Sequence, residues 1–170
     1  MSITIRPVHP DDADDLAHIL VTAEQHTFRG LVPEQCLKFT EEQSAVNWKR
    51  SFAGEFPGED DRFVVAETKS KKVVGFAWGY PTDIFPGFAA ELKMISVLPD
   101  YHRQGIGRQL ISHIVADFRN RGIESLWLKV VQVNPNRRFY EQLGGIHIAT
   151  GIYNWDGVDM IECIYGWRNI

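Results

Sequence analysis

The stretch LPDYHRQGIGRQLI, residues 98–111, places two glycines one residue apart where a helix is about to start. Apolar side chains then recur at helical spacing, and Gly122 follows them as a stop signal. A strand that feeds a helix through a Gly-x-Gly turn leaves several backbone N–H groups pointing at one place, beside the positive end of the helix dipole. The pattern therefore predicts either an anion site, typically for a phosphate, or only a tight strand-to-helix turn.

Two well-defined phosphate motifs do not fit this stretch. Gly105 and Gly107 permit a close approach to the backbone because they lack a Cβ, and Arg103 and Arg108 add positive charge. No Gly-Lys-Ser/Thr follows, which excludes a P-loop. The third glycine of a dinucleotide fingerprint would fall at Leu110, so that site is not indicated either.

Length and composition place the chain among ordinary globular proteins. Its 170 residues predict a single domain, residues 1–170, with 44% hydrophobic and 24% charged residues. The net charge of -4 argues against broad nucleic-acid binding and mildly suits a cationic substrate. Cys36 and Cys163 form no CxxC pair and are expected to be reduced thiols. The sequence shows no signal-peptide pattern, no apolar run of about 18 residues and no metal-ligand spacing. We therefore expect a cytoplasmic protein that neither crosses a membrane nor binds a metal ion.

Periodicity predicts the order β, α, α, β, β, β, α, β, α, β, β, which indicates a mixed α/β sheet covered on both faces. Thr27–Lys38 is broken by Gly30 and Pro33, and Lys69–Lys72 is a tight turn. The expected strands are Ile3–Arg6, Phe63–Ala66, Val73–Tyr80, the run Ala90–Leu98, the β-rich Glu124–Val133, Ile146–Tyr153 and Met160–Trp167. The expected helices start at Pro10, cover Glu41–Phe52 and Gly107–Arg121, and run from Asn134-Pro135 to Gly144-Gly145.

A second motif, NPNRRFYEQLGG, covers residues 134–145. Asn134 suits a helix N-cap, Pro135 the first helical position, and Gly144 the end of the helix. Tyr140 has two interpretations. It is either a packed aromatic side chain or a positioned acid with a pKa of about 10, able to give a proton to a departing thiolate.

The two motifs at this spacing resemble the GCN5-related N-acetyltransferase (GNAT) superfamily, in a bacterial small-molecule or peptide branch. The likeness covers nearly the whole chain and is strongest in ELKMISVLPDYHRQGIGRQL and NPNRRFYEQLGG. His102 stands where the family's Q/R-x-x-G-x-G/A loop commonly has Gln or Arg. The resemblance implies an α/β single-domain GNAT fold. Its sheet is mostly antiparallel and splays between the fourth and fifth strands, near residues 95–97 and 128–131, with helices on both faces.

The resemblance also implies a binding mode for acetyl-CoA as co-substrate. Its pantetheine arm would lie along the strand at Ile95, Ser96 and Val97, and Asn134 would touch it. Tyr140 would sit near the thioester sulfur. The loop Arg103, Gln104, Gly105, Ile106, Gly107 and Arg108 would hold the pyrophosphate on the following helix.

Acyl transfer to an amine requires a proton acceptor, because at a pKa of about 10.4 only about one amine in a few thousand is neutral at pH 7. We predict Glu91 as this base, since similar family members often carry an acidic residue there; a solvated strand-end carboxylate is the alternative. Glu91 is expected to alternate with Lys93, Ile95 and Val97 along one strand. Glu24, Asp83 and Glu162 are weaker alternatives for the base.

For the remaining steps, Tyr140 is the predicted acid and the N–H near Val97 the predicted oxyanion donor. The expected acceptor is a small amine or a peptide, and dimers are common among similar proteins. The alternative function is a non-catalytic acyl-CoA sensor or partner-binding module on the same fold.

Overall fold

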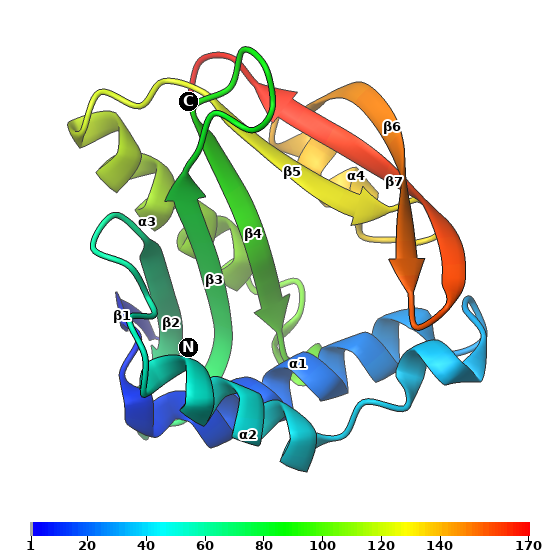
Figure 1. Cartoon of the computed structure of the whole chain (residues 1–170). Coiled ribbons are helices and arrows are strands. Elements are labelled where there is room, and N and C mark those ends of the chain that lie inside the picture. Colours follow the sequence, from blue (N-terminus) through cyan, green and yellow to red (C-terminus); the bar gives the residue numbers. More distant parts are fainter. Residues whose placement is uncertain (1) are drawn as a thin grey trace.

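The computed structural model describes residues 2–170, in the predicted order of strands and helices (Figure 1). The strands are β1 (Ile3–Pro7), β2 (Arg62–Thr68), β3 (Val73–Pro81), β4 (Ala90–Val97), β5 (Leu126–Val131), β6 (Ile146–Trp155) and β7 (Val158–Trp167). The α-helices are α1 (Ala13–Phe28), α2 (Glu41–Phe52), α3 (Ile106–Asn120) and α4 (Arg137–Gln142). Short 3₁₀ turns cover η1 (Pro10–Asp12), η2 (Glu34–Leu37) and η3 (Pro99–Tyr101).

The seven strands form one sheet in the order β1-β2-β3-β4-β5-β7-β6. Every neighbouring pair is antiparallel except β4 and β5, which are parallel and joined only at Glu91 and Trp127. The strands separate beyond that pair, so the predicted splay at residues 95–97 and 128–131 is confirmed. An opening within the sheet, between two strands that are both otherwise paired, is the feature around which the site is built.

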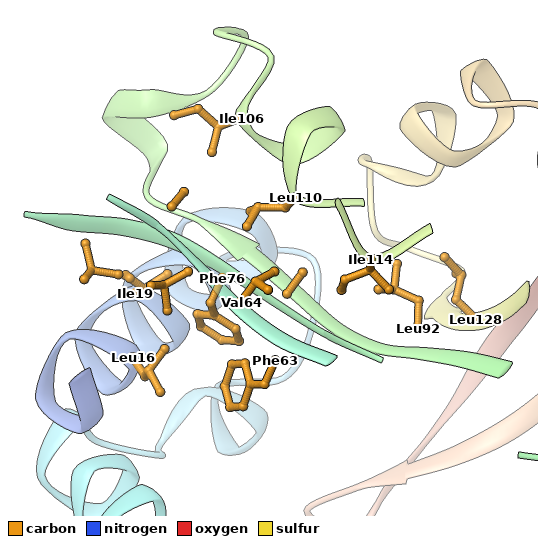
Figure 2. Packing of buried hydrophobic residues seen from close by; sticks show 14 of the residues in the cluster. Leu16, Ile19, Phe63, Val64, Phe76, Leu92, Ile106, Leu110, Ile114 and Leu128 are labelled. Carbon is orange, nitrogen blue, oxygen red and sulfur yellow. The ribbon is translucent and has the colours of Figure 1, made fainter. Parts of the chain in front are cut away.

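Helices cover both faces of the first half of the sheet, as predicted. On one face Leu16 and Ile19 of α1 are buried, and Trp48 of α2 packs against Phe76 with ring centroids 6.0 Å apart. On the other face α3 buries Leu110, Ile114 and Phe118 of its predicted apolar face, together with Ile106, which precedes the predicted start of the helix. Figure 2 shows Leu16 and Ile19 on one side of β2, β3 and β4, and Ile106, Leu110 and Ile114 on the other side. The burial fixes α3, and hence its N-terminus, against the sheet.

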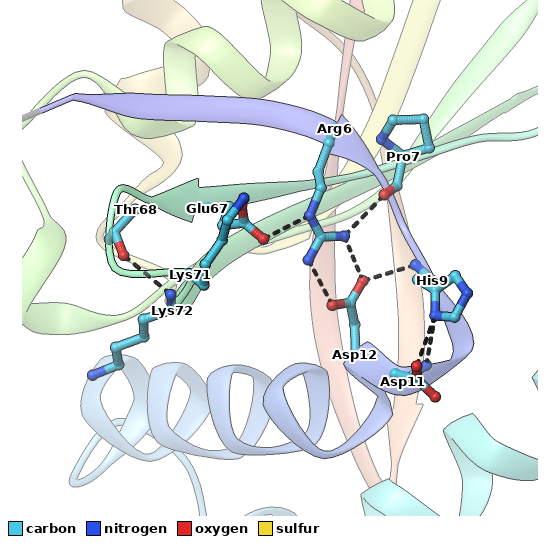
Figure 3. Close-up of polar contacts among 9 residues, drawn as sticks. All are labelled: Arg6, Pro7, His9, Asp11, Asp12, Glu67, Thr68, Lys71 and Lys72. Atoms are coloured by element: carbon cyan, nitrogen blue, oxygen red, sulfur yellow. Dashed lines mark hydrogen bonds and ion pairs between the residues drawn. The ribbon is translucent and has the colours of Figure 1, made fainter.

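Side chains close the N-terminus of α2 and the 3₁₀ turn η1 that leads into α1, whereas α1 itself has no side-chain cap. Thr40 and Gln43 form a reciprocal capping box at α2, so the predicted start of that helix is confirmed. At the other helix, Arg6 of β1 donates to both carboxylate oxygens of Asp12 at 2.8 Å and to Glu67 of β2 at 2.9 Å (Figure 3). This cluster ties the first strand, the entry to α1 and the second strand together.

Two local predictions were wrong. The helix predicted to start at Asn134-Pro135 begins at Arg137 with Asn136 as its N-cap residue. Asn134 instead closes a turn before it, because its side-chain oxygen accepts the N–H of Asn136 at 2.8 Å. The backbone oxygen of Asn134 accepts a hydrogen bond from the Arg137 N–H at 3.3 Å. A helix cap and an Asx turn draw on the same residue types, so sequence cannot separate them.

The second error concerns β4, where the predicted alternation of Glu91, Lys93, Ile95 and Val97 does not hold. Trp78 pairs with Met94 and Gly79 with Leu92, so Lys93 is an extra residue in a β-bulge. One inserted residue reverses the facing of everything beyond it. Glu91 and Ile95 therefore lie on opposite faces of the sheet.

The Arg6 cluster generates a stability prediction. Burial by itself raises the pKa of Asp12, but hydrogen bonds from Arg6 and the His9 amide outweigh it and leave the pKa below its ordinary value of 3.8. Asp12→Asn should lower the free energy of unfolding by about 2 kcal/mol at pH 7. Because a lowered carboxyl pKa stabilises the fold above pH 3.8 and is lost below it, the difference should shrink as the solution is acidified.

Urea unfolding across this pH range measures the effect, with Asp11→Asn as the matched control. The Asp11 side chain is 92% exposed, and its change should stay within about 0.5 kcal/mol. Equal destabilisation by the two variants would contradict the role given to the cluster.

Candidate functional site

The edge of β4 that faces the splay carries unpaired backbone groups. Leu98 N–H donates to Val74 at 2.9 Å, which makes 74 and 98 a hydrogen-bonded antiparallel pair. Since such pairs alternate, the N–H and C=O groups of Ile95 and Val97 point away from β3 and into the splay. No β5 residue pairs with them, because that pairing is confined to Glu91. An extended ligand with amide groups can add here as a strand would.

The N-terminus of α3 presents a second set of unused backbone donors. The first helical hydrogen bond runs from Gln109 N–H to Gly105 at 3.0 Å, and no side chain caps the helix. The N–H groups of residues 105–108 are therefore not used by the helix itself. This is the opposite of α2, whose start is closed by its own side chains. An anion satisfies these donors and the dipole together.

Each glycine of the loop has a separate structural reason. Gly105 has a φ of +79°, and Arg103 before it a φ of +61°. Gly107 sits against α4, where an added Cβ would lie 3.3 Å from the ring of Phe139. The first glycine shapes the turn and the second permits close packing, so the pattern is more than a generic break between a strand and a helix.

His102, the position that departs from the resembled loop pattern, turns back to β4. Its Nε2 lies 2.8 Å from the carbonyl oxygen of Val97, and its ring meets that of His26 edge-on at 5.8 Å. The side chain thus contacts the exposed strand edge and the end of α1. It braces the loop against β4, a role that Gln or Arg would fill differently.

These elements surround a cavity of about 1050 Å³. That size is at the upper end for small-molecule sites and suits a large ligand. Its walls come from α1, β4, the loop before α3, and the segment 132–142. The structure brings together nearly all the predicted binding residues: Ile95, Ser96, Val97, Arg103, Gly105, Ile106, Gly107, Arg108, Asn134 and Tyr140.

Gln104 and Glu91 are the predicted site residues that do not line the cavity. The Gln104 amide instead donates to the carbonyl of Asp100 at 3.2 Å. Glu91 is buried, 4% exposed, which excludes the solvated alternative; its carboxylate accepts from the Tyr80 hydroxyl at 2.6 Å and lies 3.4 Å from Lys93. The bulge at Lys93 turns Glu91 toward the face of Trp78 and Tyr80.

Tyr140 combines burial with a hydroxyl that no described residue of 2–170 engages in a hydrogen bond. The residue is 9% exposed and lines the cavity, with the Phe139 and Tyr165 rings 5.4 and 6.4 Å away. Burial raises the pKa of Tyr140 to about 12. The phenol is therefore protonated at neutral pH and free to donate to a group placed in the cavity.

Sequence reasoning gave too little weight to two charged residues that line this cavity. Glu24 of α1 was only a weaker candidate, because a single acid on an amphipathic helix has no pattern to distinguish it. Burial, and then the charge of Asp156, raise the pKa of Glu24 to about 7. Arg137 was not singled out at all, yet its Nε is buried without a hydrogen-bond partner in the described chain.

The other base candidates lie elsewhere. Asp83 is exposed in the loop after β3, and Glu162 of β7 lies 3.5 Å from Lys129. Within residues 2–170 no three His, Cys, Asp or Glu side chains gather as metal ligands would. None of the described helices has the length and apolarity needed to cross a membrane.

Comparisons with known proteins agree with this geometry. The model of the Acetyltransferase (GNAT) family matches residues 23–145. The uncharacterised N-acetyltransferase YuaI of Bacillus subtilis is 26% identical over 171 residues, covering 99% of this chain and 94% of its own.

Two solved structures share the fold. The ribosomal-protein-S18-alanine N-acetyltransferase of Escherichia coli has a TM-score of 0.67 at 26% identity, over 97% of this chain and 92% of its own. The PaiA N-acetyltransferase of Thermoplasma acidophilum, solved in complex with coenzyme A, has a TM-score of 0.66 at 23% identity, over 95% and 98%.

The helix start predicts a specific loss of binding. Gly105→Glu places a carboxylate beside the free amides and should weaken coenzyme A binding at least about tenfold, which is about 1.4 kcal/mol. Gly122→Glu is the matched control, because both glycines have a positive φ and open space around an added Cβ, but Gly122 follows the far end of α3. Calorimetric titration of the two folded variants measures the difference. Equal coenzyme A affinities of the two variants would contradict the role of these backbone amides in binding the anion.

Proposed function

Because the chain belongs to the Acetyltransferase (GNAT) family, we propose that it moves an acetyl group from the thioester of acetyl-CoA to a primary amine by direct attack in a ternary complex. One observation carries the proposal. The free amides of residues 105–108, the open edge of β4 and the unbonded Tyr140 hydroxyl all belong to a single cavity. A diphosphate, an amide-bearing arm and a departing sulfur are the three parts of one co-substrate that these features match.

The N-terminus of α3 would receive the diphosphate, with Arg103 and Arg108 adding charge. Ile95 and Val97 would pair with the amides of the pantetheine arm through their backbone groups. Asn134 borders the same cavity, although its side-chain oxygen is engaged with Asn136. Its free amide nitrogen is the part that we assign to the arm.

The chemistry then requires two donors from the chain. The acceptor nitrogen forms a bond to the acetyl carbonyl carbon, and the backbone N–H of Val97, which points into the splay, would stabilise the resulting oxyanion. As the carbon–sulfur bond breaks, the Tyr140 hydroxyl would give its proton to the thiolate. Holding both reactants in one cavity supplies much of the rate.

The acceptor is expected to be a small amine or a peptide. The E. coli relative is named for a ribosomal-protein alanine, which is a peptide amine. We place the reaction in the cytoplasm, where the sequence predicts the protein to be.

An amine panel with acetyl-CoA, read by release of free thiol, tests the function. The panel should include polyamines, amino acids and peptides with a free N-terminal amine. We expect thiol release that depends on one class of amine. The same amine should gain about 42 Da by mass spectrometry, because an acetyl group that replaces an N–H hydrogen adds C₂H₂O. Tight acetyl-CoA binding without thiol release from any amine would favour the sensor alternative.

Tyr140 provides a mutational test. Tyr140→Phe should lower kcat about 100-fold or more while changing acetyl-CoA affinity less than about threefold, because the hydroxyl acts on the leaving sulfur and not on binding. The hydroxyl has no partner to lose, so the unfolding midpoint should be unchanged or slightly raised. Steady-state kinetics, a binding titration and thermal unfolding measure the three quantities. Undiminished turnover would remove Tyr140 from the acid role.

A further inference from the structure

One partly buried carboxylate has no partner among the described residues 2–170. Seven carboxylates within residues 2–170 are buried or half-buried: Asp12, Glu24, Asp61, Glu67, Glu91, Asp117 and Glu162. Six of them contact a basic side chain or a hydrogen-bond donor, such as Arg6 for Asp12 and Tyr80 for Glu91. Glu24 alone makes no hydrogen bond and no ion pair with any described residue. Such a group costs free energy unless something else compensates it.

Glu24 lies in the wall of the cavity that contains Tyr140. Ala23, Glu24, Thr27 and Phe28 form the face of α1 that borders the cavity, as their helical spacing requires. In Figure 1, α1 runs past the C-terminal end of β4, where the splay is widest. The carboxylate is therefore available to a ligand inside the cavity, and no basic side chain of residues 2–170 forms an ion pair with it.

The surroundings of Glu24 are acidic. Burial is the main cause that brings its pKa to about 7, and the charge of Asp156 in the β6–β7 turn adds to it. Tyr153 of β6 also faces this region, since Glu24, Asp156, Glu162 and Cys36 all raise the pKa of its phenol after burial. The carboxylate therefore has a pKa near neutral pH, and its acidic surroundings favour a positively charged ligand.

We propose that Glu24 is the base of the reaction and that the acceptor enters as an ammonium ion, whose proton this carboxylate takes. The inference rests on the proposed acetyl transfer and adds to it the proton acceptor and the charge state of the substrate.

The proton balance follows directly. The acceptor ammonium gives one proton to the Glu24 carboxylate, which becomes a neutral carboxylic acid, and the nitrogen gains the lone pair that attacks the acetyl carbon. After the attack, the second nitrogen proton leaves to solvent as the amide forms, and Tyr140 supplies the proton of the free thiol. Solvent restores both side chains to their starting states.

Glu91 is the rival for this role. It is already hydrogen-bonded to Tyr80, lies next to Lys93 and does not line the cavity. A base must be able to reach the proton that it removes, directly or through one water molecule. Glu24 lines the cavity in which the acceptor would be held, and Glu91 does not.

The test is the pH dependence of kcat/KM for the wild type and Glu24→Gln, with the best amine from the panel. The wild type should show an acidic limb near pH 7, and the variant should lose that limb and about 100-fold in rate at pH 7.5. Its rate should approach that of the wild type near pH 10, because the amine then loses its own proton at a pKa of about 10.4. Glu42→Gln, on the exposed side of α2, is the control and should keep the wild-type profile.

A second variant separates a base from a merely structural residue. Asp156→Asn removes the charge that raises the pKa of Glu24, so the acidic limb should move to lower pH without disappearing. Asn also accepts the positive φ of 48° at this position. A wild-type profile in Glu24→Gln, or loss of the limb in Glu91→Gln but not in Glu24→Gln, would overturn the proposal.

Thermal unfolding tests the carboxylate independently of turnover. A raised carboxyl pKa means that the folded state loses stability as pH rises from about 4.5 to 7, because burial then opposes the charge. Glu24→Gln should therefore raise Tm by roughly 2–4 °C at pH 8 and leave it unchanged near pH 4.5. If this shift appears while no amine releases thiol from the wild type, the proposed transfer fails. If thiol is released but the shift and the limb are absent, only the role of Glu24 fails.

Discussion

The single backbone pairing between β4 and β5 is the constraint on which the site depends. Both strands are held firmly on their outer sides, β4 by β3 and β5 by β7, so the sheet stays intact while its centre opens. The opening leaves the backbone groups of Ile95 and the N–H of Val97 without a strand partner, while the Val97 carbonyl is met by His102. An unpaired strand edge within a sheet normally costs stability or invites aggregation, and here it lines a cavity instead.

The start of α3 likewise leaves backbone groups unpaired where a ligand can bind. The chain caps α2 with Thr40 and Gln43 and ties the entry of α1 to β1 through Arg6, yet it leaves the first amides of α3 uncapped. Apolar burial of Ile106, Leu110, Ile114 and Phe118 holds that helix in place without a cap. Stability therefore comes from one side of the helix and ligand binding from its end.

Charge is distributed in the cavity by element. The loop and the helices after it contribute Arg103, Arg108, Arg137 and Arg138 together with the acidic Glu141, and this excess of positive charge suits a phosphate-bearing molecule. The α1 wall contributes Glu24, with Asp156 of the β6–β7 turn near it. A molecule with negative phosphates and a separate molecule with an ammonium group would thus be drawn to different walls of one space, which is what transfer between two substrates requires.

The sequence by itself determined the order of the elements, the apolar periodicity of α3 and the two glycines of the loop before it, because periodicity and backbone freedom are local properties. Only the tertiary structure decided where side chains point once local signals conflict. The β-bulge at Lys93 turned Glu91 away from the cavity, and an Asx turn at Asn134 delayed α4 until Arg137. The importance of Glu24 likewise emerged only in three dimensions, since the lack of a partner for a charge depends on every segment that could have supplied one.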